Sequence, residues 1–271
     1  MLSSLQNPLV KQLRKLHRAK ERDKQNCFLI EGTHLLDEAC RVGWPLLVVC
    51  HTTDWQRSYP RLWEQAIQQA QRVELVSTDV IEAIATTAHP DGVVASAGRR
   101  DQTQVNQVNG PPSLGLAVEM LQDPGNLGTI IRTAAAAAVD RVWLSEDSVD
   151  LEHPKVLRAS AGQWFRLPME RRRTWYEDLE RLRGQVQIVA TCPNAAVSYW
   201  DIDLTQPTLI LVGNEGAGLS AKAIDLANTQ VSIPAAANVE SLNAAIATAL
   251  ILYEAVRQRK LLAGEYIEGI F

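Results

Sequence analysis

Two short apolar runs near the C-terminus each end in a loop of small and uncharged polar residues. The segment 209–219 reads LILVGNEGAGL, and the segment 231–243 reads VSIPAAANVESLN. In α/β proteins, loops at the carboxyl ends of strands build ligand crevices. The two segments therefore predict the position of the active site.

A third segment, 122–132, reads QDPGNLGTIIR. Asn126 follows a Pro-Gly turn and is predicted to cap a helix. Arg132 is the only charged residue between Asp123 and Asp140 and is followed by a threonine and five alanines. A lone guanidinium among small residues usually meets a phosphate or a carboxylate, although an ordinary surface arginine is the alternative.

The glycines of the segment 213–218 are spaced as GxxGxG, and no Lys-Ser or Lys-Thr pair follows them. This spacing is neither the GxGxxG of a dinucleotide site nor a phosphate-binding loop, which disfavours NAD and ATP. Glycines still allow backbone groups to face a ligand, and a plain turn is the alternative. Further on, Ser241 or Asn238 is predicted to cap the last helix, whose start favours an anionic or polar ligand. The alternative is that Ser241 and Asn243 serve only as caps.

Strands alternate with helices on both sides of a polar stretch at 99–112 that ends in Gly-Pro-Pro. Before it, we expect strands at 28–30, 46–50, 73–76 and 92–96 and helices at 32–42, 59–71 and 79–87. After it, we expect strands at 114–118, 142–144, 187–190, 209–212 and 231–233 and helices at 127–138, 155–162, 175–183, 221–226 and 241–259. The pattern predicts a small α/β domain at 1–105 and a second α/β domain with a largely parallel sheet at 106–271.

Positive charge is concentrated at the N-terminus. Residues 1–24 contain seven Lys and Arg and two acidic residues, which gives a net charge of +5. Residues 25–271 contain 20 Lys and Arg and 29 acidic residues, which gives a net charge of −9. Leucines at 9, 13 and 16 recur at helical spacing, which predicts an amphipathic basic helix. Its bases form either a solvated face or a phosphate-contacting one, and the candidates for RNA binding are Lys11, Arg14, Lys15 and Arg18.

The composition is that of a soluble globular protein, with 46% hydrophobic and 21% charged residues in 271. No apolar stretch reaches the length of a membrane span, and no secretory signal is visible, so we expect a cytoplasmic protein without membrane association. The four cysteines show no CxxC spacing and no nearby His pairs, which predicts reduced thiols and no metal site.

Taken in order, the three segments resemble the SpoU (TrmH) family of RNA ribose 2′-O-methyltransferases within the SPOUT class. The shared pattern comprises Asn126-x-Gly128-x-x-x-Arg132, the GNEGxGL of 213–219, and Ile233-Pro followed by the ESLN of 240–243. The match extends to 154–162 and covers roughly residues 114–260. The N-terminal part is similar, on FLIEG at 28–32 and the preceding basic helix, to an L30-type RNA-binding substrate domain.

The resemblance implies a C-terminal trefoil knot that binds S-adenosylmethionine, and a homodimer in which two subunits complete each site. It implies methylation of a ribose 2′-hydroxyl in structured RNA, with ribosomal rather than transfer RNA expected because of the extra domain. An RNA-binding SPOUT-fold protein without catalysis and an α/β enzyme with another nucleotide cofactor are the alternatives. By position, the resemblance implies that the cofactor is bound by Thr191, Gly213, Ile233 and Leu242. It implies that the transferred methyl group and the target ribose are surrounded by Arg132, Asn126, Glu215, Ser241 and Asn243.

Two points remain open within this resemblance. A guanidinium rarely gives up a proton, so we expect Arg132 to bind the neighbouring phosphate and stabilise the alkoxide instead of acting as the base assigned in the family. The chain also has Ala235, Ala237 and Ala244 where members commonly have Met, Gly and Val. These replacements are small and apolar, so we expect them to alter the shape of the pocket without removing a polar group.

Overall fold

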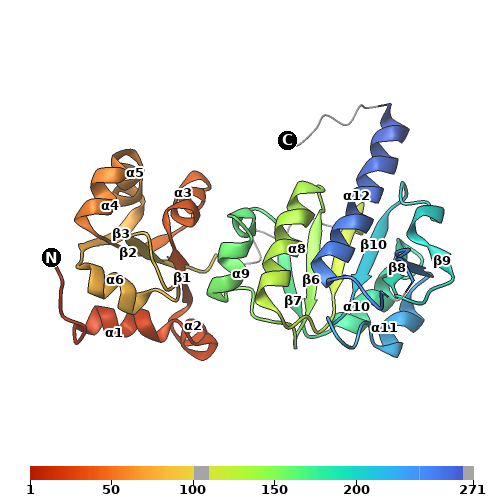
Figure 1. Cartoon of the computed structure of the whole chain (residues 1–271), viewed down its shortest axis with the longest axis horizontal. Coiled ribbons are helices and arrows are strands. Elements are labelled where there is room, and N and C mark those ends of the chain that lie inside the picture. Colours follow the sequence, from red (N-terminus) through yellow and green to blue (C-terminus); the bar gives the residue numbers. More distant parts are fainter. Residues whose placement is uncertain (101–109, 238, 265–271) are drawn as a thin grey trace. The chain divides into compact units, whose positions relative to one another are not determined.

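A computed structural model describes residues 1–100, 110–237 and 239–264, and the chain divides into two compact units (Figure 1). The first unit comprises Met1–Val105 with Asp150–Arg166, and the second comprises Asn106–Val149 with Leu167–Phe271. The boundary expected near residue 105 lies outside the described residues, as does the predicted cap Asn238.

The first unit is built on a mixed four-stranded sheet in the order β1-β4-β2-β3. Its strands are β1 (Cys27–Glu31), β2 (Leu46–His51), β3 (Ala70–Leu75) and β4 (Val93–Gly98), and its helices are α1 (Pro8–Lys15), α2 (Ala19–Gln25), α3 (Thr33–Arg41), α4 (Thr53–Ser58), α5 (Pro60–Gln69) and α6 (Thr78–Ile84). Alternate residues of β1 enter different hydrophobic clusters: Phe28 and Ile30 one, Cys27 and Leu29 the other. Each face of the sheet is therefore covered by its own hydrophobic cluster.

The single basic helix that the sequence predicts is interrupted, so that prediction is wrong in its extent. Helix α1 ends at Lys15, and α2 begins at Ala19. The side chain of Arg22 on α2 turns inward, where it is 2% exposed, donates to the backbone oxygens of Leu16 and His17, and pairs with Asp150. A buried guanidinium thus satisfies the carbonyl groups left free where α1 ends.

Residues 150–166, which follow residue 105 in sequence, pack with the first unit. They form α9 (Pro154–Ala159) and the short 3-10 helix η1 (Gln163–Phe165). Leu157 and Phe165 join the cluster that contains Phe28. Ion pairs surround this apolar contact and are made by Arg99 with Glu152, Arg158 with Glu31, and Arg166 with Glu38.

The second unit contains a seven-stranded sheet in the order β7-β6-β5-β10-β8-β11-β9, in which every neighbouring pair is parallel. Its strands are β5 (Leu114–Val118), β6 (Arg141–Ser145), β7 (Met169–Arg172), β8 (Gln187–Thr191), β9 (Val197–Ser198), β10 (Thr208–Val212) and β11 (Thr229–Ser232). Its helices are α8 (Pro124–Ala136), α10 (Trp175–Leu182), α11 (Ala221–Leu226), α12 (Ala244–Ala263) and the short η2 (Tyr199–Asp201). The predicted parallel α/β architecture is confirmed, whereas the knot stays a prediction.

Two helix starts differ from the prediction. Helix α8 is capped by Asp123, whose carboxylate accepts from the backbone N–H of Asn126, so Asn126 is not the cap. Helix α12 begins at Ala244, not at 241, and its cap is Asn243, the alternative to the predicted Ser241 or Asn238. In both cases several residues able to cap stand within a few positions, and the one that is used depends on where the chain turns.

Candidate active site

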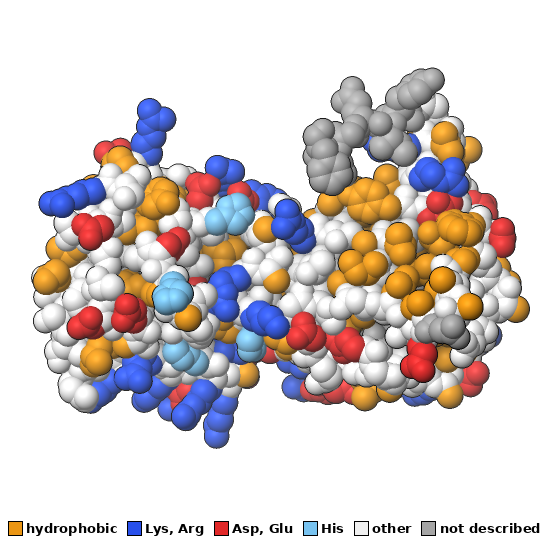
Figure 2. Space-filling model, viewed as in Figure 1, with side chains coloured by type: hydrophobic (Ala, Val, Ile, Leu, Met, Phe, Trp, Pro, Cys, Tyr) orange, Lys and Arg blue, Asp and Glu red, His pale blue; other side chains and the backbone are white. Residues whose placement is uncertain are grey.

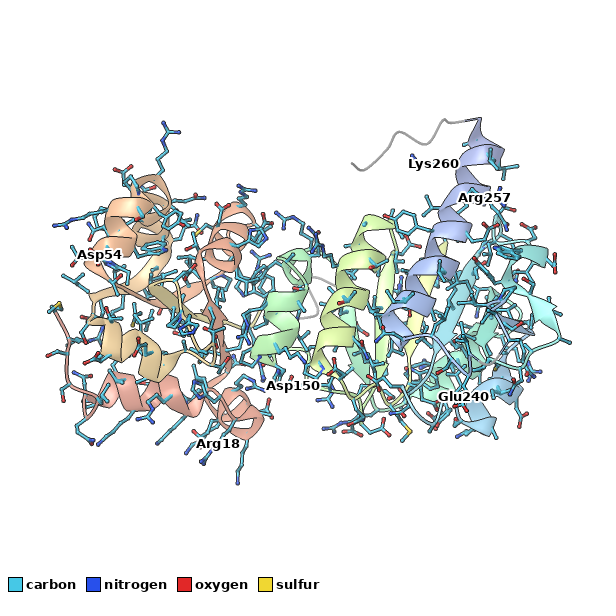
Figure 3. All side chains as sticks on the ribbon, viewed as in Figure 1. Arg18, Asp54, Asp150, Glu240, Arg257 and Lys260 are labelled. Carbon is cyan, nitrogen blue, oxygen red and sulfur yellow. The ribbon has the colours of Figure 1, made fainter. Side chains whose placement is uncertain are left out.

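A cavity of about 400 Å³ lies in the second unit at the carboxyl ends of β8, β10 and β11. These strands are neighbours in the parallel sheet, so the loops that follow them meet at one edge. Residues 233–235 and 239–242, among which Figure 3 labels Glu240, form a further wall. The cavity brings together Thr191, Gly213, Ile233 and Leu242, and also Glu215 and Ser241.

The lining of this cavity combines apolar, uncharged polar and acidic side chains. Val212, Val231, Ile233 and Leu242 supply hydrocarbon surface, while Glu215 and Glu240 supply carboxylates. None of the described residues that line it is Lys or Arg. Phosphate-bearing ligands usually require such cations, so the cavity suits a ligand that is neutral or positively charged.

The loop after β10 closes tightly on itself. The backbones of Asn214 and Gly218 exchange two hydrogen bonds of 3.0 Å, and the side-chain oxygen of Asn214 accepts from the N–H groups of Gly216 and Ala217. A Cβ at Gly213 would lie 2.2 Å from the carbonyl carbon of Gly218. Glycine is therefore required at position 213 for the turn to close, in addition to any ligand contact.

Two residues that follow β5 hold this loop at its two ends. The amide nitrogen of Asn214 donates to the backbone oxygen of Met120 at 2.8 Å. Glu119, which is 1% exposed, accepts from the backbone N–H and the hydroxyl of Ser220 at 2.8 and 2.6 Å and from the Tyr176 hydroxyl at 2.6 Å. Ser220 is in turn the N-cap of α11.

Three predicted site residues form one hydrogen-bonded chain. The amide nitrogen of Asn243 donates to the side-chain oxygen of Asn126 at 2.9 Å, and the amide nitrogen of Asn126 donates to Glu215 at 3.1 Å. The Asn243 oxygen accepts from the N–H groups of Ala245 and Ile246. The chain thus joins the first turns of α8 and α12 to the loop after β10.

The carboxylate of Glu215 is held ionised by its donors. Partial burial by itself would raise the pKa of Glu215, but hydrogen bonds from the backbone N–H of Asp123, the side chain of Asn126 and the backbone N–H of Gln122 outweigh it. The net effect is a pKa below the ordinary value. Glu215 therefore serves as a fixed acceptor at neutral pH and is unsuited to be a proton donor.

Arg132 is not brought to the cavity within one chain. Its side chain is exposed on α8, and it has no hydrogen-bond or ion-pair partner among the residues that the structure describes. Ser241 lines the cavity and is exposed. The Thr191 hydroxyl donates to the backbone oxygen of Leu211 at 2.9 Å, which leaves its oxygen free only to accept.

Glu119 and the segment Cys192–Asn194 also belong to this site and are absent from the sequence prediction. Cys192, Pro193 and Asn194 line the cavity directly after β8. Glu119 carried a usable signal, since it is a charged residue immediately after the buried run of β5 and therefore at the sheet edge where the site lies.

The arrangement matches known proteins across nearly the whole chain. Residues 113–253 match the SpoU rRNA Methylase family, and residues 7–95 match the MRM3-like substrate binding domain. The chain belongs to the SpoU rRNA methylase family. That SpoU match spans the predicted active-site segments, and the second match coincides with the first unit's sheet and basic helices.

The similarity to individual known proteins extends over almost the whole length of this chain. It is 46% identical over 262 residues to an uncharacterized tRNA/rRNA methyltransferase of Synechocystis sp., which covers 95% of this chain and 94% of the relative. It is 33% identical to the 23S rRNA (guanosine(2553)-2′-O)-methyltransferase RlmP of Bacillus subtilis, with coverage of 93% and 97%. The AdoMet-bound rRNA methyltransferase from Sinorhizobium meliloti superposes with a TM-score of 0.82 at 33% identity, covering 94% of this chain and 97% of that one.

The described part of the chain has neither a membrane-spanning helix nor a group of metal ligands. Within the described ranges, no helix combines the length and the apolar character needed to cross a bilayer. In the same ranges, no three His, Cys, Asp or Glu side chains gather as metal ligands would.

Proposed function

We propose that this protein transfers a methyl group from S-adenosylmethionine to a ribose 2′-hydroxyl of structured RNA, and that the RNA is ribosomal. The proposal rests on the cavity at β8, β10 and β11, whose described lining combines apolar side chains, uncharged polar side chains and two carboxylates and contains no Lys or Arg. S-adenosylmethionine has an uncharged nucleoside, a sulfonium, an ammonium group and a carboxylate, so its net positive charge matches this lining. The B. subtilis relative named as a 23S rRNA 2′-O-methyltransferase supports the choice of acceptor.

In this proposal, the four predicted cofactor residues contact S-adenosylmethionine either through backbone groups or through their side chains. Gly213 and Ile233 offer backbone groups at the ends of β10 and β11, Leu242 offers apolar surface, and Thr191 offers a hydroxyl oxygen. When bound, S-adenosylmethionine supplies a methyl group already activated by a positive sulfur. The protein then needs mainly to align the acceptor oxygen and to assist loss of its proton.

The acceptor side is assigned to exposed residues beside the cavity. Arg132 binds the phosphate next to the target ribose and stabilises negative charge that develops on the 2′-oxygen. Ser241 lies at the cavity wall, where its hydroxyl can orient the ribose. Asn126, Glu215 and Asn243 act as positioning residues, because most of their hydrogen-bonding groups are already used within the chain.

A homodimer forms part of the same proposal. Ile246, Leu250 and Tyr253 recur at helical spacing on α12 and are 52%, 39% and 38% exposed. Figure 2 shows hydrophobic side chains gathered over α12. Covering this face with a second copy would remove it from water, and it would allow one subunit to supply Arg132 to the cavity of the other. The RNA substrate places the reaction in the cytoplasm.

Cofactor binding is the first test of this proposal. Calorimetry with S-adenosylmethionine is expected to show one site per chain. Leu242→Arg should abolish binding, because it introduces bulk and positive charge at the cavity, whereas Val197→Arg should not. Leu242 and Val197 are both 38% exposed, and only Leu242 lines the cavity, so they form a matched pair.

Methyl transfer is the second test. Incubation with tritiated S-adenosylmethionine and total RNA is expected to label ribosomal RNA. Cofactor binding without labelling of any RNA would favour the alternative of an RNA-binding protein that keeps the fold without catalysis. Absence of cofactor binding would overturn the proposed function.

A further inference from the structure

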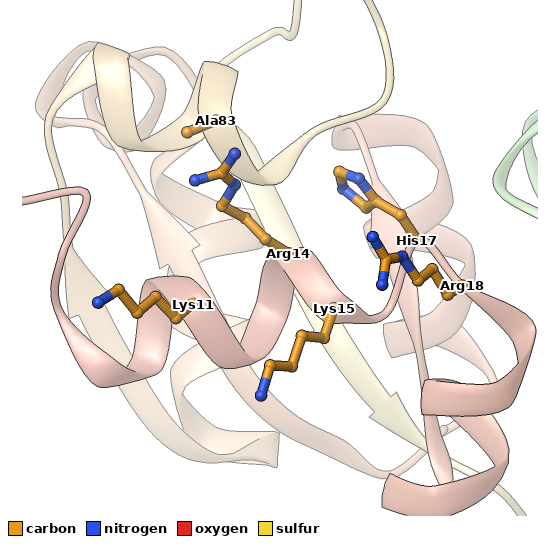
Figure 4. Close-up of a pocket in the computed structure, with 6 residues that line it drawn as sticks. All are labelled: Lys11, Arg14, Lys15, His17, Arg18 and Ala83. Atoms are coloured by element: carbon orange, nitrogen blue, oxygen red, sulfur yellow. The ribbon is translucent and has the colours of Figure 1, made fainter.

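Four basic side chains of the first unit line one hollow. Lys11, Arg14, Lys15 and Arg18 are exposed, and together with His17 and Ala83 they line it. Figure 4 shows Arg14 and His17 on the side of α1 toward Ala83 of α6, while Lys11 and Lys15 extend from α1 on another side. Figure 3 labels Arg18 at the lower edge of the first unit, and Figure 2 shows Lys and Arg side chains gathered along that edge.

These four bases form no ion pair with the described residues, although Glu21 lines the neighbouring hollow that includes Lys11 and Lys15. None has an ion-pair or hydrogen-bond partner in the described part of the chain, a property they share with the exposed Arg57 and Arg61. Six other arginines of the same unit are paired with carboxylates: Arg22, Arg41, Arg72, Arg99, Arg158 and Arg166. A favourable interaction with the end of α1 would explain Arg14 and Lys15, which lie in its last turn. It does not explain Lys11 or Arg18, and the mutual repulsion among four neighbouring cations decreases when an anion binds.

The base of the hollow is held in place. The Nε2 atom of His17 lies 2.6 Å from the backbone oxygen of Ile84, and because that oxygen can only accept, Nε2 is the donor. This bond ties the turn after α1 to the end of α6. The hollow is thus preformed, so little ordering is required when a ligand binds.

A second hollow on α1 extends the basic surface. It shares Lys11 and Lys15 with the first and adds Lys24, together with Pro8, Gln12, Glu21 and Gln25. Glu21 accepts from the side-chain amide of Gln25 at 3.3 Å. Two adjacent hollows that share two lysines suit a ligand with several consecutive negative charges better than a single small anion.

The chemistry of the first hollow favours backbone contact over base reading. No Phe, Tyr or Trp is among the described residues that line it, although single-stranded RNA sites usually stack bases on such rings. We propose that Lys11, Arg14, Lys15 and Arg18 bind consecutive phosphates of double-helical RNA without reading its bases. This inference rests on the proposed function, and it assigns to the first unit affinity for helical RNA and to the second unit the choice of nucleotide.

Fluorescence anisotropy with the full-length protein and two labelled RNA duplexes of unrelated sequence tests this proposal. Arg14→Gln with Arg18→Gln is compared with Arg57→Gln with Arg61→Gln, a control that removes the same charge from exposed arginines on α4 and α5. Affinity is measured from about 50 to 200 mM salt, because the slope of log K against log salt should fall by about 1 for every phosphate that the protein no longer neutralises.

The unmodified protein is expected to bind both duplexes with similar affinity and more tightly than a single strand. The Arg14 and Arg18 variant should lose roughly 2 from the salt slope for both duplexes, and the control should change little. Equal slopes in variant and control, a marked preference for one duplex, or tighter binding of the single strand would overturn the inference. Circular dichroism and thermal melting confirm that both variants are folded.

Calorimetry with S-adenosylmethionine on the same samples separates this inference from the proposed function. Intact cofactor binding without duplex binding by the unmodified protein would overturn only the RNA site. Duplex binding without cofactor binding would overturn only the methyltransferase. Both variants should bind the cofactor as the unmodified protein does, since none of the four arginines lines its cavity.

Discussion

The side-chain amide of Asn243 donates a 2.9 Å hydrogen bond to Asn126, although the two residues are 117 positions apart. Asn243 also caps α12, and Asn126 also donates to Glu215. One amide therefore serves both the start of a helix and the geometry of the site. Its two functions can be separated because they use different atoms.

Asn243→Asp should separate them. The carboxylate still accepts from the N–H groups that begin α12, but it cannot donate to Asn126. We expect near-normal thermal stability and a rate of methyl transfer reduced several-fold, since a neutral hydrogen bond contributes roughly 1 kcal/mol. Asn243→Ala should show the same loss of rate and a further loss of about 1 kcal/mol in the free energy of unfolding. An Asp variant with an unchanged single-turnover rate would contradict this.

The features that the sequence predicts well are those with local causes. Strands β5 and β10 are buried at all five positions, so their apolar runs are visible in the sequence. Strand β7 reads MERR, and β9 has two residues, so neither has a recognisable period. The choice of Asn243 over Ser241 as cap, and its bond to Asn126, depend on contacts between distant segments that single-sequence patterns do not contain.

Glu119 is expected to position the loop after β10, which lines the cavity proposed to bind the cofactor. Three donors from Ser220 and Tyr176 meet its buried carboxylate, and Glu119→Gln would place an N–H group against at least one of them. A buried donor left unsatisfied costs roughly 1–3 kcal/mol. We expect weaker binding of S-adenosylmethionine by calorimetry and a raised KM for it, with the KM for RNA unchanged. Tyr176→Phe removes one bond only and should have a smaller effect.

The control for Glu119 is a substitution that destabilises without touching the loop. Leu116→Ala, on the neighbouring buried strand β5, should lower the melting temperature by creating a cavity. If Leu116→Ala and Glu119→Gln lowered cofactor affinity equally at matched stability, the role of Glu119 in positioning the loop would be refuted.

Arg132 is expected to act through charge. Arg132→Lys keeps a cation and should retain measurable methyl transfer, whereas Arg132→Ala should lose most of it while cofactor binding is unchanged. Stopped-time assays at saturating RNA give the rates, and anisotropy gives RNA affinity. Complete inactivity of the Lys variant with unaltered RNA affinity would show that charge alone does not account for Arg132.

The depressed pKa of Glu215 predicts a pH-dependent contribution to stability. Since the folded state favours the carboxylate, this contribution is complete above the unfolded pKa of about 4.3 and is lost as the pH falls through the lower folded value. The difference in melting temperature between the unmodified protein and Glu215→Gln should therefore be constant above about pH 5 and shrink below it. A difference that grew as the pH fell would contradict the assigned hydrogen bonds.

The position of the transferred methyl group tests the central claim most directly. Ribosomal RNA labelled by the protein and tritiated S-adenosylmethionine is hydrolysed with alkali, which requires a free 2′-hydroxyl to cleave the adjacent phosphodiester. We predict that the label is recovered in alkali-resistant dinucleotides that yield one 2′-O-methylated nucleoside. Label recovered in mononucleotides, and hence on a base, would contradict ribose methylation.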